Sequence, residues 1–165
     1  MKNKPKILIS ACLLGENCKY NGGDNANAIC ANALAKLRQI YKLVAVCPEC
    51  LGGLTTPREP AEICVNGRVI TKFSGRDVTD EFILGAQICA DIARKNDCKI
   101  AVLKERSPSC GSGWIYDGSF TGRIVSGDGI TAAALKSLGV RVVGESALSE
   151  LNLEKEAENG RVDKC

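Results

Sequence analysis

The stretch that decides the fold is the apolar run Ile100-Ala101-Val102-Leu103 and the loop that follows it, Ser107-Pro108-Ser109-Cys110-Gly111-Ser112-Gly113. A short apolar run bounded by turn residues is typical of a strand buried on both faces of a parallel sheet. Two similar runs also lead into a cysteine, residues 7–11 into Cys12 and residues 43–46 into Cys47. Because ligands of open α/β sheets bind at the carboxyl ends of the strands, these three thiols predict one shared site.

The rest of the chain alternates predicted strands with predicted helices. Strands are expected over 6–11, 43–47, 99–104 and 140–143, and helices over 25–40, 77–95 and 130–138. Asn66-Gly67 sits between two β-rich runs, which predicts a hairpin over residues 62–70. Residues 116–122 indicate a turn-rich loop. The expected fold class is α/β, a small Rossmann-like three-layer domain with a mostly parallel sheet and a β-hairpin excursion.

Length and charge limit the domain count and the partners. The 165 residues fit one domain, expected over residues 1–148, with a charged tail over residues 149–165 that is either a frayed helix or disordered. The net charge of +3 is too small to indicate a nucleic-acid partner by itself, and the higher positive charge outside the acidic tail favours an anionic or polar small ligand. The modest charge and the lack of an evident aromatic stacking platform argue against long RNA. The sequence indicates no oligomeric state.

Cysteine and histidine usage indicates the cellular compartment and the kind of site. The chain has ten cysteines and no histidine, which excludes a mixed Cys/His zinc site and an imidazole general base. Long buried strands are atypical of a secreted disulfide scaffold and favour metal or cluster ligation in a reducing compartment. The apolar run at residues 7–9 is too short for a signal peptide, and no segment has the about 18 apolar residues that span a membrane. We therefore expect a cytoplasmic protein without a membrane partner.

The remaining cysteines have simpler interpretations. Cys30, Cys89 and Cys98 lie among apolar helix residues and are expected to pack in the core. Cys47-Pro48-Glu49-Cys50 is formally a C-x-x-C motif, as in redox pairs or half of a zinc site. A redox pair would normally begin a helix, whereas we expect a loop to begin at Leu51-Gly52-Gly53. Cys18 and Cys50 are therefore second-rank candidate ligands.

Three thiolates without histidine suit an iron–sulfur cluster that has one iron free of protein ligands. Glu49 follows Cys47 by two residues, and on an extended segment both side chains can face the site. It is a candidate general base or nucleophile there, or else a solvated loop glutamate. The other candidates are hydroxyl donors, close-approach glycines and an anion-binding arginine, namely Ser107, Ser109, Ser112, Gly111, Gly113 and Arg58.

Several motifs in order resemble the thiouracil desulfurase family, over roughly residues 5–145. They are Ser10-Ala11-Cys12-Leu13-Leu14-Gly15, Val46-Cys47-Pro48-Glu49, Leu51-Gly52-Gly53-Leu54-Thr55-Thr56-Pro57-Arg58, Pro60-Ala61-Glu62-Ile63, Ser107-Pro108-Ser109-Cys110-Gly111 and Ile115-Tyr116-Asp117-Gly118-Ser119-Phe120. The resemblance implies a 4Fe-4S cluster held by Cys12, Cys47 and Cys110. It also implies catalytic roles for Glu49 and for either Ser107 or Ser109. From their residue types, we expect Arg58, Gly111 and Ser112 to bind the substrate. Cys50 stands where the family pattern leads us to expect an aliphatic residue.

The expected function is non-redox desulfuration of a thiolated pyrimidine such as 2-thiouracil, which gives the oxo product and sulfide. The resemblance implies that the thiocarbonyl sulfur binds the open iron. Two alternatives stay open. One is a non-catalytic iron–sulfur sensor or carrier of sulfide or a thionucleotide. The other is a structural zinc protein that uses Cys12, Cys47, Cys50 and Cys110. The residues do not distinguish a free base, a nucleoside or thiolated RNA as the substrate.

Overall fold

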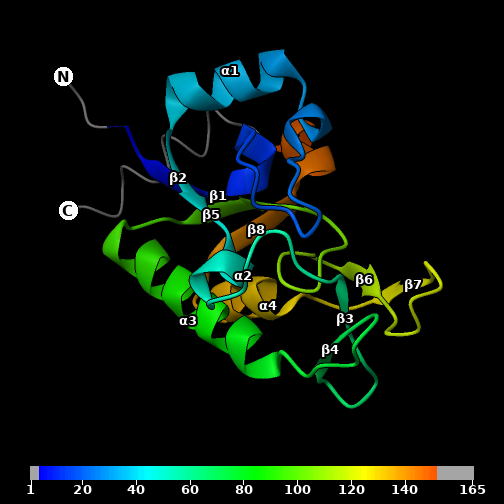
Figure 1. Ribbon diagram of the computed structural model, residues 1–165. Coiled ribbons are helices and arrows are strands. Elements are labelled where there is room, and N and C mark those ends of the chain that lie inside the picture. Colours follow the sequence, from blue (N-terminus) through cyan, green and yellow to red (C-terminus); the bar gives the residue numbers. More distant parts are fainter. Residues whose placement is uncertain (1–3, 152–165) are drawn as a thin grey trace.

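Four parallel strands form the centre of this computed structural model, which describes residues 4–151 (Figure 1). They are β1 (Lys6–Ser10), β2 (Lys42–Val46), β5 (Ile100–Leu103) and β8 (Arg141–Gly144). Their order in the sheet is β2-β1-β5-β8. The predicted α/β class with a mostly parallel sheet is therefore confirmed.

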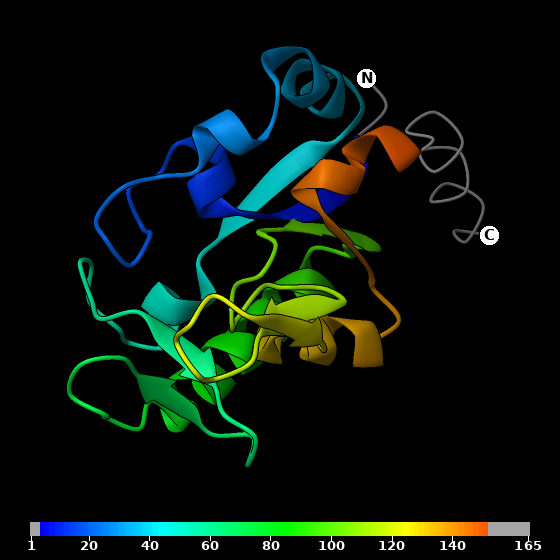
Figure 2. The ribbon, with the colours of Figure 1, turned by 90° about the vertical axis from the view of Figure 1, so that its right-hand side faces the viewer.

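Helices cover both faces of this sheet and complete the expected three layers. Helix α1 (Ala31–Ile40) lies on one face, and α3 (Thr79–Lys95) and α4 (Ile130–Ser137) lie together on the other (Figures 1 and 2). The one-turn helix α2 (Pro48–Leu51) packs against α3. Since α1 joins β1 to β2 on one face and α3 joins β2 to β5 on the other, the chain changes direction between β1 and β5.

Alternating side chains of the inner strands build two apolar cores. Ile7 and Ile9 of β1 pack with α1, whereas Leu8 packs with α3 and α4. Strand β5 is buried along its whole length, as its continuous apolar run predicts. Cys89 and Cys98 are buried in the core, as predicted. The prediction for Cys30 is wrong: this residue is exposed, because it lies in extended conformation just before α1.

Two hairpins extend from the domain on the same side (Figures 1 and 2). Strands β3 (Ala61–Ile63) and β4 (Val69–Thr71) pair antiparallel, which confirms the predicted hairpin. Strands β6 (Trp114–Tyr116) and β7 (Ile124–Ser126) form a second hairpin around the turn-rich loop. Its strands are three residues long, too short for an alternating pattern to reveal them in the sequence.

The helix expected over residues 25–40 is wrong in its first part. A 3₁₀ turn, η2, covers Ala26–Ala28, Ile29 is extended, and the α-helix begins only at Ala31. The Asp24 carboxylate accepts the Ala26 backbone N–H at 2.8 Å. This local bond closes a turn and competes with helix formation. A second 3₁₀ turn, η1 (Ala11–Leu14), follows β1.

A third 3₁₀ turn, η3 (Glu145–Glu150), follows β8. Leu148 and Leu151 are buried in the core beneath α1. Residues 152–165 of the predicted charged tail lie outside the described part of the chain. The predicted boundary between domain and tail at residue 148 stays a prediction. Within residues 4–151, no helix has the length and apolar character needed to cross a membrane.

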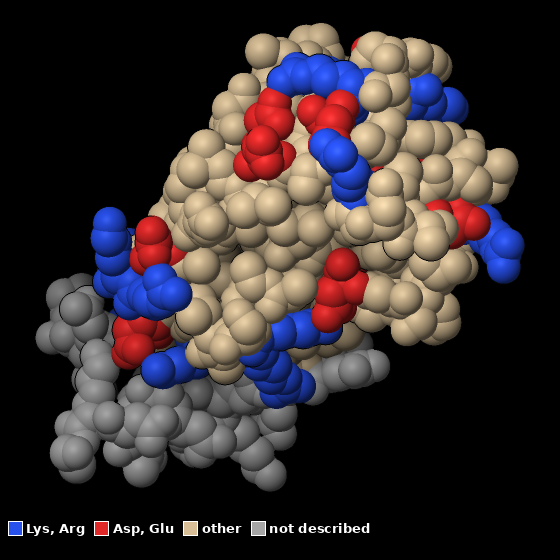
Figure 3. Space-filling view, turned by 90° about the horizontal axis from the view of Figure 1, so that it is seen from below, with Lys and Arg blue, Asp and Glu red and all other residues tan. Residues whose placement is uncertain are grey.

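Basic and acidic side chains lie close together on the face over α3 and α4 (Figure 3). Arg76 pairs with Glu81, and Arg94 pairs with Asp91 at 2.7 Å. Neither sign of charge dominates this view of the surface. This face therefore offers no extended basic area for a polyanion.

The contact between α2 and α3 leaves no room for a side chain at two glycines. A Cβ at Gly85 would lie 2.0 Å from the Pro48 carbonyl oxygen, and a Cβ at Gly52 would lie 1.9 Å from the Glu81 carbonyl oxygen. Both distances are far below any real contact. The two backbones therefore touch directly, and α2 is fixed on α3.

We expect Gly85→Ala to destabilise the protein by about 2 kcal/mol, as overpacking does, although alanine in a helix interior normally gains about 1 kcal/mol over glycine. Equilibrium urea unfolding measures the change. Gln87→Ala, on the exposed face of the same helix, is the control and should leave the midpoint unchanged. A Gly85→Ala variant as stable as the wild type would contradict the close contact.

Candidate active site

A cavity of about 710 Å³ opens at the carboxyl ends of the strands, next to the change of direction between β1 and β5. This is the location that open α/β sheets use for ligands. Cys12, Cys18, Cys47 and Cys110 all line the cavity. The structure thus brings the three predicted ligands together and adds Cys18, while Cys50 does not line it.

Each predicted ligand follows a different strand. Cys12 lies on η1 after β1, Cys110 lies in the loop after β5, and Cys47 is the N-cap of α2 after β2. The expectation that the C-x-x-C motif does not begin a helix is wrong, because the motif forms α2; the loop predicted at Leu51-Gly52-Gly53 begins at Gly52. Pro48 suits the first position of a helix, where its missing N–H costs nothing. Glu49 is therefore positioned by a helical turn and not by an extended segment.

Cys18 holds the loop between η1 and η2 against α2. Its carbonyl oxygen accepts hydrogen bonds from Arg58 Nη2 at 2.9 Å, from the Cys47 thiol at 3.7 Å and from the Cys50 thiol at 3.9 Å. Its thiol also shares hydrogen bonds with the Cys12 and Cys47 thiols. Sequence reasoning ranked Cys18 second because its spacing from Cys12 fits no usual metal motif.

These contacts and the nearby charges shift the pKa values of the thiols in the protein without a bound cofactor. Hydrogen bonding by Cys18 lowers the pKa of Cys12 to about 7 and that of Cys47 to about 5. The nearby cations Lys104 and Arg58 act in the same direction on Cys12 and Cys47, respectively. Burial instead raises the pKa of Cys110 well above its ordinary value. Cys18 has a single thiol proton, which it can donate to only one of the two at a time, so Cys12 and Cys47 share this lowering of the pKa. Cys110 needs compensation from another donor.

Glu49 and Arg58 form an ion pair at the wall of the cavity. Arg58 Nε donates to Glu49 Oε2 at 2.6 Å, and the two side chains are 8% and 17% exposed, respectively. Burial raises the pKa of the Glu49 carboxyl, and Arg58 opposes this rise. The remaining Arg58 donors reach Thr55, Thr56 and the Cys18 carbonyl. Arg58 is therefore held as a support for Glu49.

The structure separates the serine candidates. Ser107 lines the cavity, and its Oγ accepts the N–H groups of Ser109 and Cys110, each at 3.1 Å. Its own proton is therefore free to point elsewhere. Ser109 is buried, and its hydroxyl bonds with Thr131 at 3.0 Å, beneath α4. Of the two, Ser107 is the one with access to a ligand.

Gly111 and Ser112, predicted near the substrate, do not line the cavity. The Gly111 N–H donates to the Ser107 carbonyl at 2.8 Å, and a Cβ there would lie 3.0 Å from the Trp114 carbonyl oxygen. The loop has therefore turned away from the cavity by residue 111. Close packing against β6 accounts for the glycine.

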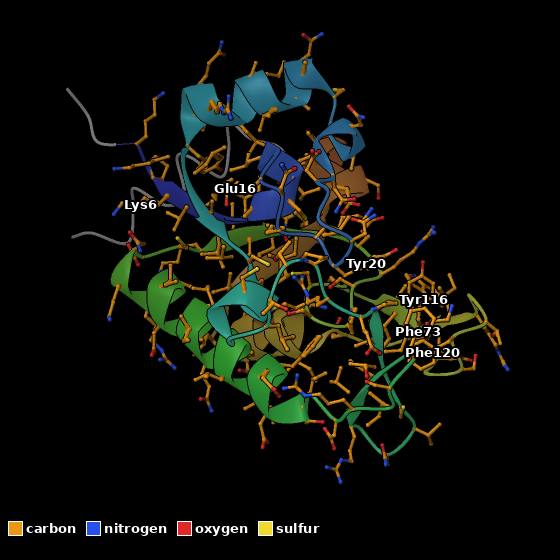
Figure 4. All side chains as sticks on the ribbon, viewed as in Figure 1. Lys6, Glu16, Tyr20, Phe73, Tyr116 and Phe120 are labelled. Carbon is orange, nitrogen blue, oxygen red and sulfur yellow. The ribbon has the colours of Figure 1, made fainter. Side chains whose placement is uncertain are left out.

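An aromatic wall that the sequence did not reveal faces the cavity. Tyr20, Tyr116 and Phe120 line it, and Figure 4 shows them on the side of the molecule that carries the hairpins. The buried Glu62 carboxylate accepts the N–H groups of Gly118 and Phe120, each at 3.0 Å. Glu62 thus joins the two hairpins and fixes this wall. The motif containing Glu62 was visible, but its partners lie more than fifty residues away.

An ion pair between Lys104 and Glu145 closes the far end of the site. Both residues line the cavity, and Glu145 is buried at the start of η3. Glu145 Oε2 also accepts the Glu105 N–H at 2.7 Å. The pair connects the end of β5 to the end of β8, which sequence reasoning missed because no local pattern marks a long-range ion pair.

Among the described residues, no three His, Cys, Asp or Glu side chains come together tightly enough for a single metal ion. The four thiols proposed for zinc are all described, so their arrangement does not favour that alternative. The cavity beside the Cys12, Cys47 and Cys110 thiols has room for a multi-iron cluster, which is larger than a single ion and is bound by cysteine thiolates. The buried Cys110 thiol and the acidic Cys47 thiol suit that donor set.

Comparisons with known proteins show the family of the chain. The model of the 2-thiouracil desulfurase family matches residues 7–147. The chain belongs to this family. It is 44% identical over 153 residues to the uncharacterized protein YbbK of Bacillus subtilis (strain 168), and the match covers 88% of this chain and 99% of that protein.

The chain is also similar to the solved structure of the [4Fe-4S]-dependent thiouracil desulfidase TudS. The two are 44% identical with a TM-score of 0.85, over 93% of this chain and 99% of that one. The predicted family and fold are confirmed.

Proposed function

We propose that this member of the 2-thiouracil desulfurase family is an iron–sulfur enzyme that converts a thiolated pyrimidine, such as 2-thiouracil, into the oxo product and sulfide without net redox change. One observation carries the proposal: three strand-end thiols and the partly buried Glu49 carboxylate line the same cavity. The substrate class is that of the similar desulfidase TudS.

Cys12, Cys47 and Cys110 would hold a 4Fe-4S cluster. When bound with three protein ligands, such a cluster offers one iron as a Lewis acid for a thiocarbonyl sulfur, which makes the attached carbon more electrophilic. Hydrogen bonding by Cys18 and the cations Lys104 and Arg58 favour the thiolate forms of Cys12 and Cys47.

Glu49 is the catalytic carboxylate of the proposal. It takes a proton from a water molecule that adds to the carbon carrying the sulfur, or it attacks that carbon itself and water then hydrolyses the bond to the carboxylate. In either case the C–S bond breaks, the sulfur leaves as sulfide, and the oxygen of the product comes from water. Arg58 holds one carboxylate oxygen, Oε2, and so leaves Oε1 to act in the cavity. A carboxylate takes this role here because the chain has no histidine.

Ser107 and the aromatic wall position the ring. The Ser107 proton is not consumed by its own loop, so it can donate to a ring nitrogen or to the developing oxygen. Tyr20, Tyr116 and Phe120 offer apolar faces for a planar base. Ser109, which bonds with Thr131, supports the fold of the loop.

A non-catalytic sensor or carrier would use the same thiols but would not need a buried carboxylate beside them. The Glu49–Arg58 pair therefore favours the enzyme. The test is anaerobic reconstitution with iron and sulfide, followed by assay of uracil and sulfide formed from 2-thiouracil. A cluster with stoichiometric binding and no turnover would support the sensor, and colourless protein with one bound zinc would support the structural zinc site.

Glu49→Gln should keep the cluster absorption and lower kcat by on the order of 100-fold or more, because a positioned general base contributes at least that much. Absorption spectra and iron content measured on the same samples separate loss of chemistry from loss of the cluster. Full turnover of Glu49→Gln would refute the assigned role.

Ser107→Ala should lower kcat on the order of 100-fold, as loss of a donor to developing charge does, and more than Ser109→Ala does. Steady-state kinetics on both variants, at equal cluster content, measure the difference. If Ser109→Ala lowers kcat more than Ser107→Ala does, then Ser109 is the residue that donates the proton.

Arg58→Met should move the acidic limb of the pH profile of kcat/KM to higher pH. Arg58 holds the pKa of Glu49 down against burial, so removing it raises that pKa, and the reactive carboxylate then forms only at higher pH. Arg76→Met, which breaks a more exposed ion pair with Glu81, is the control. If the acidic limb of the pH profile does not move in Arg58→Met, then the ionisation of Glu49 does not determine that limb.

A further inference from the structure

Ser10 is a buried polar residue that the proposed function does not use. It is the last residue of β1, and its Oγ lies 3.5 Å from the Cys110 sulfur. The two residues are 100 positions apart, and both are buried. The pairing of β1 with β5 brings them together at the carboxyl ends of the strands.

The direction of this hydrogen bond follows from the second partner of Ser10. The Lys104 backbone N–H donates to Ser10 Oγ at 2.9 Å. The oxygen therefore already accepts a hydrogen bond, and its own proton points to the Cys110 sulfur. Only a rotamer that aims the hydroxyl proton at Lys104 would break this bond, so the proton lies away from Lys104 and is available to the Cys110 sulfur.

Cys110 needs such a donor more than the other two ligands do. Cys18 shares hydrogen bonds with Cys12 and Cys47, whereas the donor that Cys110 receives is Ser10. Burial and the nearby Glu49 oppose a negative charge on Cys110, whereas the hydrogen bond from Ser10 favours it. Ser10 thus supplies compensation at the most buried thiol of the set.

We propose that Ser10 is a positioning residue that donates a hydrogen bond to the Cys110 thiolate and thereby withdraws electron density from the bound cluster. Hydrogen bonds to ligand sulfurs stabilise the more negative, reduced form and so raise the reduction potential. The same withdrawal makes the open iron a stronger acceptor for a thiocarbonyl sulfur. The inference rests on the proposed function only in that Cys110 must hold a cluster.

The test is a reductive titration of the reconstituted full-length protein, followed by electron paramagnetic resonance. Ser10→Ala should shift the cluster potential to a more negative value. Ser109→Ala is the matched control, because it removes an equally buried hydroxyl one residue from Cys110 that bonds with Thr131 instead of a sulfur. Its potential should equal that of the wild type.

A second pair of variants covers the case in which Ser10→Ala folds poorly. Ser10→Thr and Ser10→Val have nearly the same shape and differ only in the hydroxyl, so any disturbance of packing is shared. The threonine variant should have the higher potential and should need less 2-thiouracil for half of the spectral change. Equal potentials for Ser10→Thr and Ser10→Val, or for Ser10→Ala and the wild type, would overturn this inference and leave the proposed function standing. A wild-type chain that assembles no cluster would overturn the proposed function itself.

Discussion

The site depends on the direct contact between the backbones of α2 and α3 at Gly52 and Gly85. Helix α2 is a single turn and cannot hold its own position. Because its backbone rests on a long helix that is packed against the sheet, the N-cap thiol of Cys47 and the carboxylate of Glu49 acquire fixed positions. Neither glycine touches the cavity, yet both determine where two of its functional groups lie.

The same principle recurs around the cavity, where ordinary backbone groups anchor the reactive side chains. The Cys18 carbonyl oxygen accepts hydrogen bonds from Arg58 and from two thiols. The Glu62 carboxylate accepts hydrogen bonds from two backbone N–H groups of the second hairpin. A chain without histidine must obtain proton transfer from other groups, and the carboxylate proposed here needs rigid support if burial is to raise its pKa without neutralising it.

The sequence predicted those parts of the fold and site that local patterns encode. Each apolar run marked a strand, and Cys12, Cys47 and Cys110 followed such runs, so their meeting at one edge was predictable from topology. The choice between Ser107 and Ser109 was not, since both lie in one turn and only the packing of α4 sends the second towards Thr131. Ser10, Glu145 and the partners of Glu62 were equally hidden, because each acts across many residues of chain.

The spacing of the three thiols along the chain has a consequence for biosynthesis. The first two are made early, but the third follows β5 and completes the set only when most of the domain has been translated. If Cys12, Cys47 and Cys110 hold the cluster, as proposed above, a nascent chain that ends before residue 110 has an incomplete ligand set, and the cluster could bind only late in synthesis. A cluster held in this way would close two long loops of chain and cross-link three strands. Its loss would then remove a structural constraint as well as a catalytic group, and we expect the cluster-free protein to be less stable.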